Sequence, residues 1–273
     1  MGFDEKIRFV SSKSDEILAL FGRTEGDQIN AEGLQRIRQE LDSYLNRLRA
    51  PRADNCYGFG KSDLTSVMAR GSRNAAMISE EYKAQNIPSQ VGLYTAMIES
   101  EFCPCLQSST GPLGMFQFTK QTGTSYGLKT IVDASPENPD ERCTPKLSAR
   151  ASAMYYKQMI AEIFGRDSVG IPLAIGAFNR GVGTMKKHIV EASALTDAPR
   201  ISFWVLMDTQ NKVYEKYATQ INDKENAGFR PPGYFSQFQR ENIKYVPKFF
   251  AAAIIGENPK AFGLDIEPLS KIK

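Results

Sequence analysis

Residues 90–118 read QVGLYTAMIESEFCPCLQSSTGPLGMFQF, and this stretch decides the fold. Apolar side chains recur at helical spacing in its first half, at Leu93, Tyr94, Met97 and Ile98. The helix reaches a carboxylate, Glu99, and must end soon afterwards, because Pro104 cannot extend it and disfavours helical backbone at Cys103. A glycine-punctuated loop with hydroxyl and amide side chains follows. A carboxylic acid facing such a loop is suited to protonating the leaving group of a sugar.

The same stretch resembles the core motif of the lysozyme-like (SLT) lytic transglycosylases, a murein-cleaving family related to the goose-type lysozymes. Their pattern is roughly E-S-x-F-x-P, a short spacer, and then S-x-x-G-A-x-G-L-W-Q-F. The positions that follow it without a gap are Glu99, Ser100, Phe102, Pro104, Ser108, Gly111, Gly114, Gln117 and Phe118. The positions that depart from it are Pro112 for Ala, Met115 for Leu and Phe116 for Trp. With the later matches, the resemblance covers about residues 88–264.

Two later segments resemble further motifs of this family. AFNRGVG, residues 177–183, is similar to A-Y-N-x-G-x-G, whose asparagine lies in the glycan groove of relatives and is Asn179 here. Phe178 stands where tyrosine is usual, so a hydroxyl is lost. In the last motif, which contains Y-V-P, Tyr245 is the tyrosine that lines the site near the catalytic acid in relatives. Without the resemblance, Asn179 would be read as part of a helix C-cap, and Tyr245 as a packing residue before a proline kink.

The resemblance implies a mechanism with one carboxyl group. Glu99 protonates the glycosidic oxygen between N-acetylmuramic acid and N-acetylglucosamine, and the 2-acetamido group helps stabilise the oxocarbenium-like centre. As a carboxylate, Glu99 then removes a proton from the muramyl 6-hydroxyl, whose attack gives a 1,6-anhydro end. The apolar neighbours of Glu99 predict a raised pKa, which suits a general acid. The substrate-binding residues are expected to be Ser108, Met115, Gln117, Asn179 and Tyr245. No cofactor is expected.

Other enzymatic readings stay open. A hydrolytic muramidase would recruit a second acid from the loop residues Asp133, Glu137 or Asp140. The departures at Pro112, Phe116 and Phe178 all touch the groove, so the substrate could be a modified, deacetylated glycan. Glu101 lies about 200° around the helix from Glu99 and is not assigned as a second catalytic carboxylate.

Two further hypotheses, an inactive glycan-binding module and a Ser-His-Asp hydrolase, have less support in the sequence than a glycosidase. An inactive glycan-binding module is disfavoured because Glu99 is present. A Ser-His-Asp hydrolase would depend on His188, the only histidine, which we expect on a surface helix with no nucleophile elbow nearby.

The cysteines are Cys56, Cys103, Cys105 and Cys143. Their spacing and the single histidine argue against a zinc site, so no metal is expected. They form either buried thiols or two disulfides in an oxidising compartment. A bridge between Cys103 and Cys105 would be strained, so we expect one to reach Cys143 and the other Cys56.

Net charge and local motifs indicate which kinds of binding partner the chain can have. The net charge of +3, from 34 basic and 31 acidic residues, permits approach to an anionic cell wall but is no signature of nucleic-acid binding. Gly60-Lys61-Ser62 copies the end of a phosphate-binding loop, but Asn55 stands where a glycine is required, so we expect no nucleotide. We read Ser62 as the N-cap of the next helix. No apolar run is long enough for a transmembrane segment.

We expect a mainly α fold: a lysozyme-like helical domain with a short β element around residues 111–118, plus an N-terminal helical appendage. The appendage covers residues 1–86 and the catalytic domain residues 87–273, with the boundary at Asn86-Ile87-Pro88. Helices are expected near residues 3–21, 31–49, 62–85 and 147–164, and Trp204 in the core. We expect a monomer that acts on peptidoglycan strands in the periplasm or outside a bacterial cell. The N-terminus lacks the uninterrupted apolar region of a secretory signal. Because the expected activity is on the cell wall, we expect the signal peptide to be removed or absent.

Overall fold

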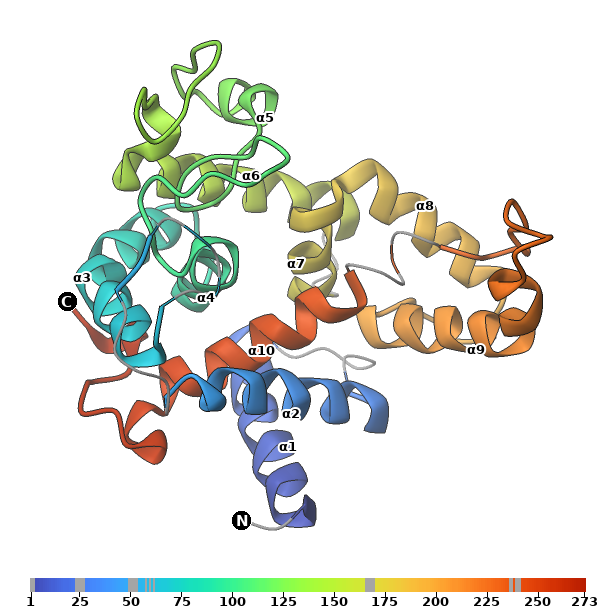
Figure 1. The fold of residues 1–273 in the computed structure, drawn as a ribbon. Coiled ribbons are helices and arrows are strands. Elements are labelled where there is room, and N and C mark those ends of the chain that lie inside the picture. The colour runs from blue at the N-terminus through green and yellow to red at the C-terminus, as the bar shows by residue number, and fades with distance from the viewer. Residues whose placement is uncertain are drawn as a thin grey trace.

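The protein is built from helices. The computed structural model describes residues 3–22, 28–48, 54–56, 58, 60, 62–164, 170–235, 238 and 242–273. The α-helices are α1 (Phe3–Leu20), α2 (Ala31–Asn46), α3 (Leu64–Lys83), α4 (Ser89–Ser100), α5 (Lys120–Ser125), α6 (Pro145–Phe164), α7 (Ile171–Arg180), α8 (Val182–Ser193), α9 (Phe203–Asn222) and α10 (Ile243–Glu257) (Figure 1). Short 3-10 helices are η1 (Glu141–Cys143), η3 (Pro259–Phe262) and η4 (Leu269–Lys271). Within the described ranges, β structure is limited to two antiparallel bridges, Gln107–Leu113 and Leu113–Phe118, so the mainly α expectation is confirmed.

Helix α4 lies at the centre of the fold. Only Gln90 and Glu99 of this helix keep part of their surface exposed, and its other residues are buried. A helix that is apolar nearly all round must be covered by neighbours, and α3, α6 and α10 pack against it. Glycines allow the closest approaches. A Cβ at Gly92 would come within 2.4 Å of the Tyr82 ring on α3, and one at Gly256 of α10 within 2.2 Å of the Tyr94 ring.

The end of α4 is held by the helices that precede it in the chain. Glu101 and Phe102 adopt positive φ, and their amides donate to the carbonyls of Met97 and Ala96. The buried Glu101 carboxylate pairs with the Arg47 guanidinium at the end of α2, at 2.6 Å. Arg70 of α3 donates to the Glu101 carbonyl at 2.9 Å. The contacts of Glu101 therefore fasten the end of α4 to α2 and α3, which is a structural role.

The N-terminal helices share the core of the molecule. Helix α2 runs beside α10, and α1 packs against both (Figure 1). Buried residues of α1 and α2 belong to the same hydrophobic cluster as those of α4 and α10: Val10, Ile17, Leu18, Ile37, Leu41 and Tyr44. The apolar stripe of α2 is thus covered within the chain. The domain boundary at residues 86–88 stays a prediction.

Two local predictions are wrong. The N-cap of α3 is Asp63, whose carboxylate accepts from the Ser66 amide at 3.1 Å, because Ser62 is drawn away to donate to the Asn55 carbonyl at 2.8 Å. His188 is buried rather than on the surface, because the chain before α10 covers α8 and places the Phe235 ring 4.8 Å from the imidazole. Trp204, in contrast, lies in the core as expected.

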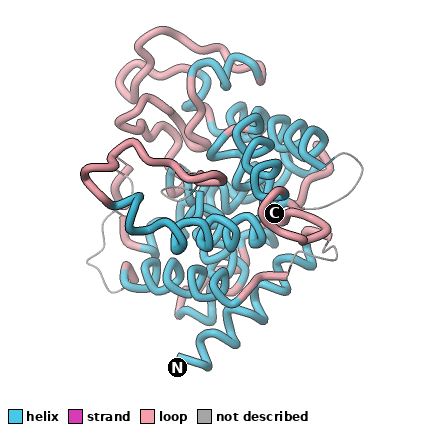
Figure 2. The backbone as a smooth tube through the Cα atoms, turned by 90° about the vertical axis from the view of Figure 1, so that its right-hand side faces the viewer, coloured by secondary structure: helices cyan, strands magenta, loops and turns pink. Residues whose placement is uncertain are grey.

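The connection between α4 and α6 is mostly loop, and it projects from one end of the helical body (Figures 1 and 2). Disulfides fasten both sides of its first turn: Cys103 pairs with Cys56, and Cys105 pairs with Cys143. The neighbouring cysteines therefore reach outward in different directions, as expected. Among the helices that the structure describes, none is long and apolar enough to cross a membrane.

We predict that Gly114→Ala destabilises the fold much more than Gly111→Ala. Both glycines adopt positive φ, of 90° and 103°, which costs an alanine about 1 kcal/mol or more. Only at Gly114 would the new Cβ meet a neighbour, the Arg142 carbonyl oxygen at 1.9 Å, whereas nothing lies within 4 Å of the Cβ at Gly111. We expect losses of about 1 kcal/mol for Gly111→Ala and at least about 3 kcal/mol for Gly114→Ala in urea unfolding. Equal losses would contradict the close packing of this loop on η1.

Candidate active site

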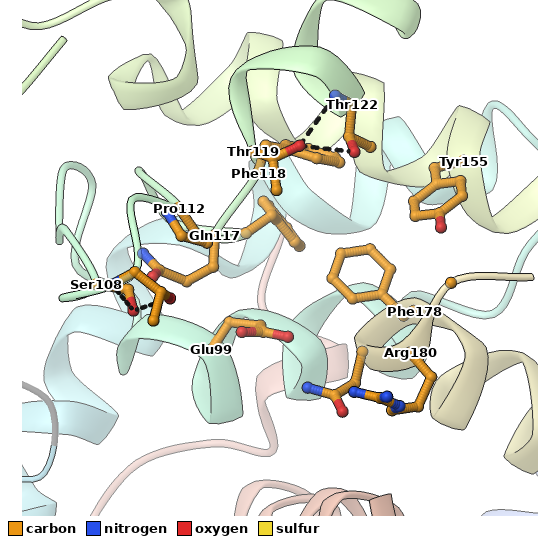
Figure 3. Close-up of a pocket in the computed structure, with 14 residues that line it drawn as sticks. Glu99, Ser108, Pro112, Gln117, Phe118, Thr119, Thr122, Tyr155, Phe178 and Arg180 are labelled. Atoms are coloured by element: carbon orange, nitrogen blue, oxygen red, sulfur yellow. Dashed lines mark hydrogen bonds between the residues drawn. The ribbon is translucent and has the colours of Figure 1, made fainter. Parts of the chain in front are cut away.

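A pocket of about 390 Å³ opens where the end of α4 meets the loop after it. Its far side is formed by α6 and by the end of α7. Figure 3 shows Glu99 between the loop residues Ser108 and Gln117 on one side and Phe178 and Arg180 on the other. The complete lining consists of Glu99, Ser108, Thr110, Pro112, Phe116, Gln117, Phe118, Thr119, Thr122, Tyr155, Phe178, Asn179, Arg180 and Gly181.

Glu99 is the one carboxylate among these lining residues. The Tyr245 hydroxyl of α10 donates a hydrogen bond to Glu99 Oε1. Burial raises the pKa of Glu99 from its ordinary value of 4.5 to about 7, against the opposing effects of the Tyr245 hydrogen bond and the Lys248 charge. Near neutral pH the carboxyl group is therefore present in both its protonated and its ionised form, as a group that alternates between acid and base requires.

The glycine-rich loop is fastened to α4 and to itself. Ser100, next to Glu99, donates its hydroxyl to the Met115 carbonyl at 2.8 Å. Gln117, at φ 50°, donates its side-chain nitrogen to the carbonyls of Leu106, at 2.7 Å, and Gly114, at 2.8 Å. Because its side-chain nitrogen is engaged in these bonds, Gln117 can contact a sugar only through its amide oxygen. This bonding makes the loop a preformed wall beside the Glu99 carboxyl group.

The opposite wall is tied to the helix that carries Tyr245. Helix α7 ends at Gly181, whose positive φ of 79° turns the chain directly after Asn179 and Arg180. The Asn179 side-chain oxygen accepts from the buried Asn242 amide at 2.7 Å. Asn242 immediately precedes α10, so one short segment positions both Asn179 and Tyr245. This leaves the Asn179 side-chain nitrogen as the donor that can face a ligand.

Sequence comparisons relate the chain to known proteins. Residues 76–201 match the model of the transglycosylase SLT domain. Over this segment the chain is similar to the SLT transglycosylases. Over 107 residues, 39% of this chain, it is 36% identical to the peptidoglycan transglycosylase gp16 of Escherichia phage T7. Over 229 residues, 84% of the chain, it is 24% identical to the membrane-bound lytic murein transglycosylase D of Escherichia coli K12. The matches span only 8% and 38% of those two proteins.

The helical architecture is that of the lysozyme-like SLT fold, and it places the expected site residues in different ways. Glu99, Ser108, Gln117 and Asn179 line the pocket. Tyr245 reaches Glu99 from α10 without forming part of the pocket wall. Met115 is fully buried and does not line the pocket, because its side chain points into the core while its carbonyl accepts from Ser100.

Of the four departures from the SLT motifs, all except Met115 lie at the pocket. Pro112, Phe116 and Phe178 are lining residues, although the Phe116 ring is itself fully buried and forms the floor. Phe178 stacks on Tyr156 at 4.9 Å between ring centroids, and Tyr155 lies 5.5 Å away. The hydroxyl lost at Phe178 therefore leaves an apolar aromatic face opposite the polar loop.

The carboxylates considered as a second acid lie elsewhere. Asp140 is bonded to Arg142 at 2.8 Å, and burial is outweighed by these bonds, so the pKa of Asp140 is lowered. Asp133 and Glu137 are exposed on the loop and do not line the pocket. In the part of the chain that the structure describes, no cluster of His, Cys, Asp and Glu could hold a metal ion.

Two residues that support the site were not singled out from the sequence: Asn242, which bonds to Asn179, and Lys248, which bonds to the backbone beside Glu99. A polar residue at the start of an apolar helix, and a lysine one turn inside it, are the signals that could have singled them out.

We predict that Glu99→Gln stabilises the fold above neutral pH. The raised pKa of Glu99, about 7, means that the folded state binds more protons than the unfolded state between about pH 4.5 and 7, so wild-type stability falls across this window. Glutamine does not titrate and loses nothing there. In urea unfolding, the advantage of the variant should grow by roughly 2–3 kcal/mol between about pH 4 and pH 8. A difference that stays constant with pH would contradict the raised pKa.

Proposed function

We propose that this chain cleaves peptidoglycan at the β-1,4 bond between N-acetylmuramic acid and N-acetylglucosamine as a lytic transglycosylase. The observation that carries the proposal is the Glu99–Tyr245 hydrogen bond at the edge of the pocket in an SLT domain. The names of the phage and bacterial relatives, which are peptidoglycan and murein transglycosylases, support the same substrate. The proposal implies that the protein acts in the periplasm or outside the cell.

In the first step, protonated Glu99 donates its proton to the glycosidic oxygen, and the bond between that oxygen and the muramyl C1 breaks. The partly buried carboxyl group is suited to this, because its raised pKa of about 7 keeps much of it protonated at neutral pH. Positive charge develops at C1, where the neighbouring acetamido oxygen can stabilise it. Ser108, Gln117 and Asn179 line the pocket. We expect the Ser108 hydroxyl, the Gln117 amide oxygen and the Asn179 amide nitrogen to bind the sugar.

In the second step, the Glu99 carboxylate takes the proton of the muramyl 6-hydroxyl, and that oxygen attacks C1. The new C1–O6 bond closes the 1,6-anhydro ring, and Glu99 ends the cycle protonated as it began. The Tyr245 hydroxyl hydrogen bond stabilises the carboxylate between the two steps. Glu99 as the one carboxylate in the pocket lining supports this single-residue route.

The product decides between transfer and hydrolysis. Purified chain is incubated with native and with de-N-acetylated peptidoglycan, and the released muropeptides are weighed by mass spectrometry. We expect products lighter by one water molecule than the hydrolytic ones, because the 6-hydroxyl replaces water. Reducing ends would replace this proposal with a muramidase. Activity on the deacetylated glycan alone would show that the acetamido group is not needed, and silence on both substrates would leave a glycan-binding module.

We predict that Glu99→Gln lowers the cleavage rate by roughly 10²–10⁴-fold or more, because the amide cannot donate a proton. The side chain is nearly isosteric and can still accept from Tyr245, so the fold should be kept. Circular dichroism checks that the variant is folded, and co-sedimentation with insoluble peptidoglycan checks that it still binds. A folded Glu99→Gln variant that still releases muropeptides at the wild-type rate would contradict the role of Glu99 as the proton donor.

A further inference from the structure

Lys248 places a second contact of α10 beside Glu99. It follows Tyr245 by three residues, so both side chains lie on the same face of the helix. The Lys248 ammonium donates to the Ile98 carbonyl oxygen at 3.2 Å, and Ile98 is the residue before Glu99. Helix α10 therefore contacts the carboxyl group through Tyr245 and the adjacent backbone through Lys248.

Several charged groups surround the Lys248 ammonium. From α4 and its C-cap these are Glu99 and Glu101, and from α2 and its C-cap they are Glu40 and Arg47. Burial lowers the pKa of Lys248 to about 8, while the three carboxylates oppose the shift. Glu101 has its own partner in Arg47 at 2.6 Å. Burial raises the pKa of Glu40, which favours the neutral form of its carboxyl group.

We propose that Lys248 is a positioning residue whose charge stabilises the carboxylate form of Glu99 and so allows the same residue to act as the base of the second step. The inference rests on the proposed function, because only a group that alternates between acid and base needs such a balance. Burial alone favours the neutral acid, which can begin the reaction but resists becoming the carboxylate. A fixed cation beside a carboxyl group lowers its pKa by about 1–3 units and restores the balance.

A purely structural role makes a different prediction. The Ile98 carbonyl belongs to the last turn of α4, where a lysine can simply satisfy a free helix carbonyl. In that case the hydrogen bond matters and the charge does not. Three substitutions separate the two roles. Lys248→Arg keeps donor and charge, Lys248→Gln keeps a donor without charge, and Lys248→Met removes both. Lys244→Met, at an exposed position one turn earlier on α10, is the matched control for loss of a lysine.

The test is a direct titration of Glu99. The protein is labelled with ¹³C at the glutamate side-chain carboxyl, the Glu99 signal is assigned by its absence in Glu99→Gln, and its shift is followed with pH. We expect the Glu99 pKa to rise by roughly one unit in both Lys248→Gln and Lys248→Met, and to stay at the wild-type value in Lys248→Arg and Lys244→Met. An unchanged Glu99 pKa in folded Lys248→Gln overturns the inference. Lys248→Gln also keeps the experiment decisive if Lys248→Met fails to fold.

Cleavage of peptidoglycan gives the second readout. Loss of the charge should move the alkaline limb of the pH–rate profile upward by the same amount as the Glu99 titration, and should lower the plateau rate about tenfold. A lower plateau with an unmoved limb would assign Lys248 a structural role. The titration does not require activity, so a chain without cleavage activity would refute the proposed function while the inference is still decided by the Glu99 signal.

Discussion

The central constraint in this molecule is a carboxyl group on a helix that is otherwise buried. Neighbouring helices cover α4 nearly all round because it is apolar, and Glu99 is the position where that cover opens onto the pocket. A charge at such a position is costly unless it is solvated or hydrogen-bonded. The Tyr245 hydroxyl and the nearby Lys248 ammonium compensate part of this desolvation cost. The incomplete compensation is what holds the group between its two protonation states.

The sequence predicts much of the helical framework and little of the contacts across it. Apolar spacing located the helices, and Pro104 correctly indicated that α4 ends shortly after Glu99, because these are local effects. Contacts between distant segments are different. Tyr245 meets Glu99 across 146 positions of the chain, and periodicity states which face of a helix is buried but not what covers it. Tyr245 and Asn179 were identified through family resemblance, whereas Asn242 and Lys248 carried only the weak signal of polar residues in an apolar helix or at its start.

Both local errors have the same origin. Ser62 is a good N-cap by type, and His188 lies in a basic stretch that is typical of a surface helix. In the folded chain, Ser62 is engaged by Asn55 and Arg70, and His188 is covered by Phe235. Tertiary partners overrode residue preference in each case. The N-terminal helices show the same effect at a larger scale, since Arg47 satisfies Glu101, a residue that the sequence alone leaves as an isolated acid beside the site.

The two disulfides also act on the chain before it folds. They close segments with sequence separations of 47 and 38 residues, and each has one cysteine within the first turn after α4. By the chain-entropy account, closures of this length each remove about 4 kcal/mol of conformational freedom from the unfolded ensemble. Residues 104–118 form an irregular loop whose β pairing is limited to two isolated bridges. With the bridges formed, the denatured chain already keeps both sides of Pro104 near their native neighbours, so ordering this wall of the pocket requires a much smaller loss of entropy.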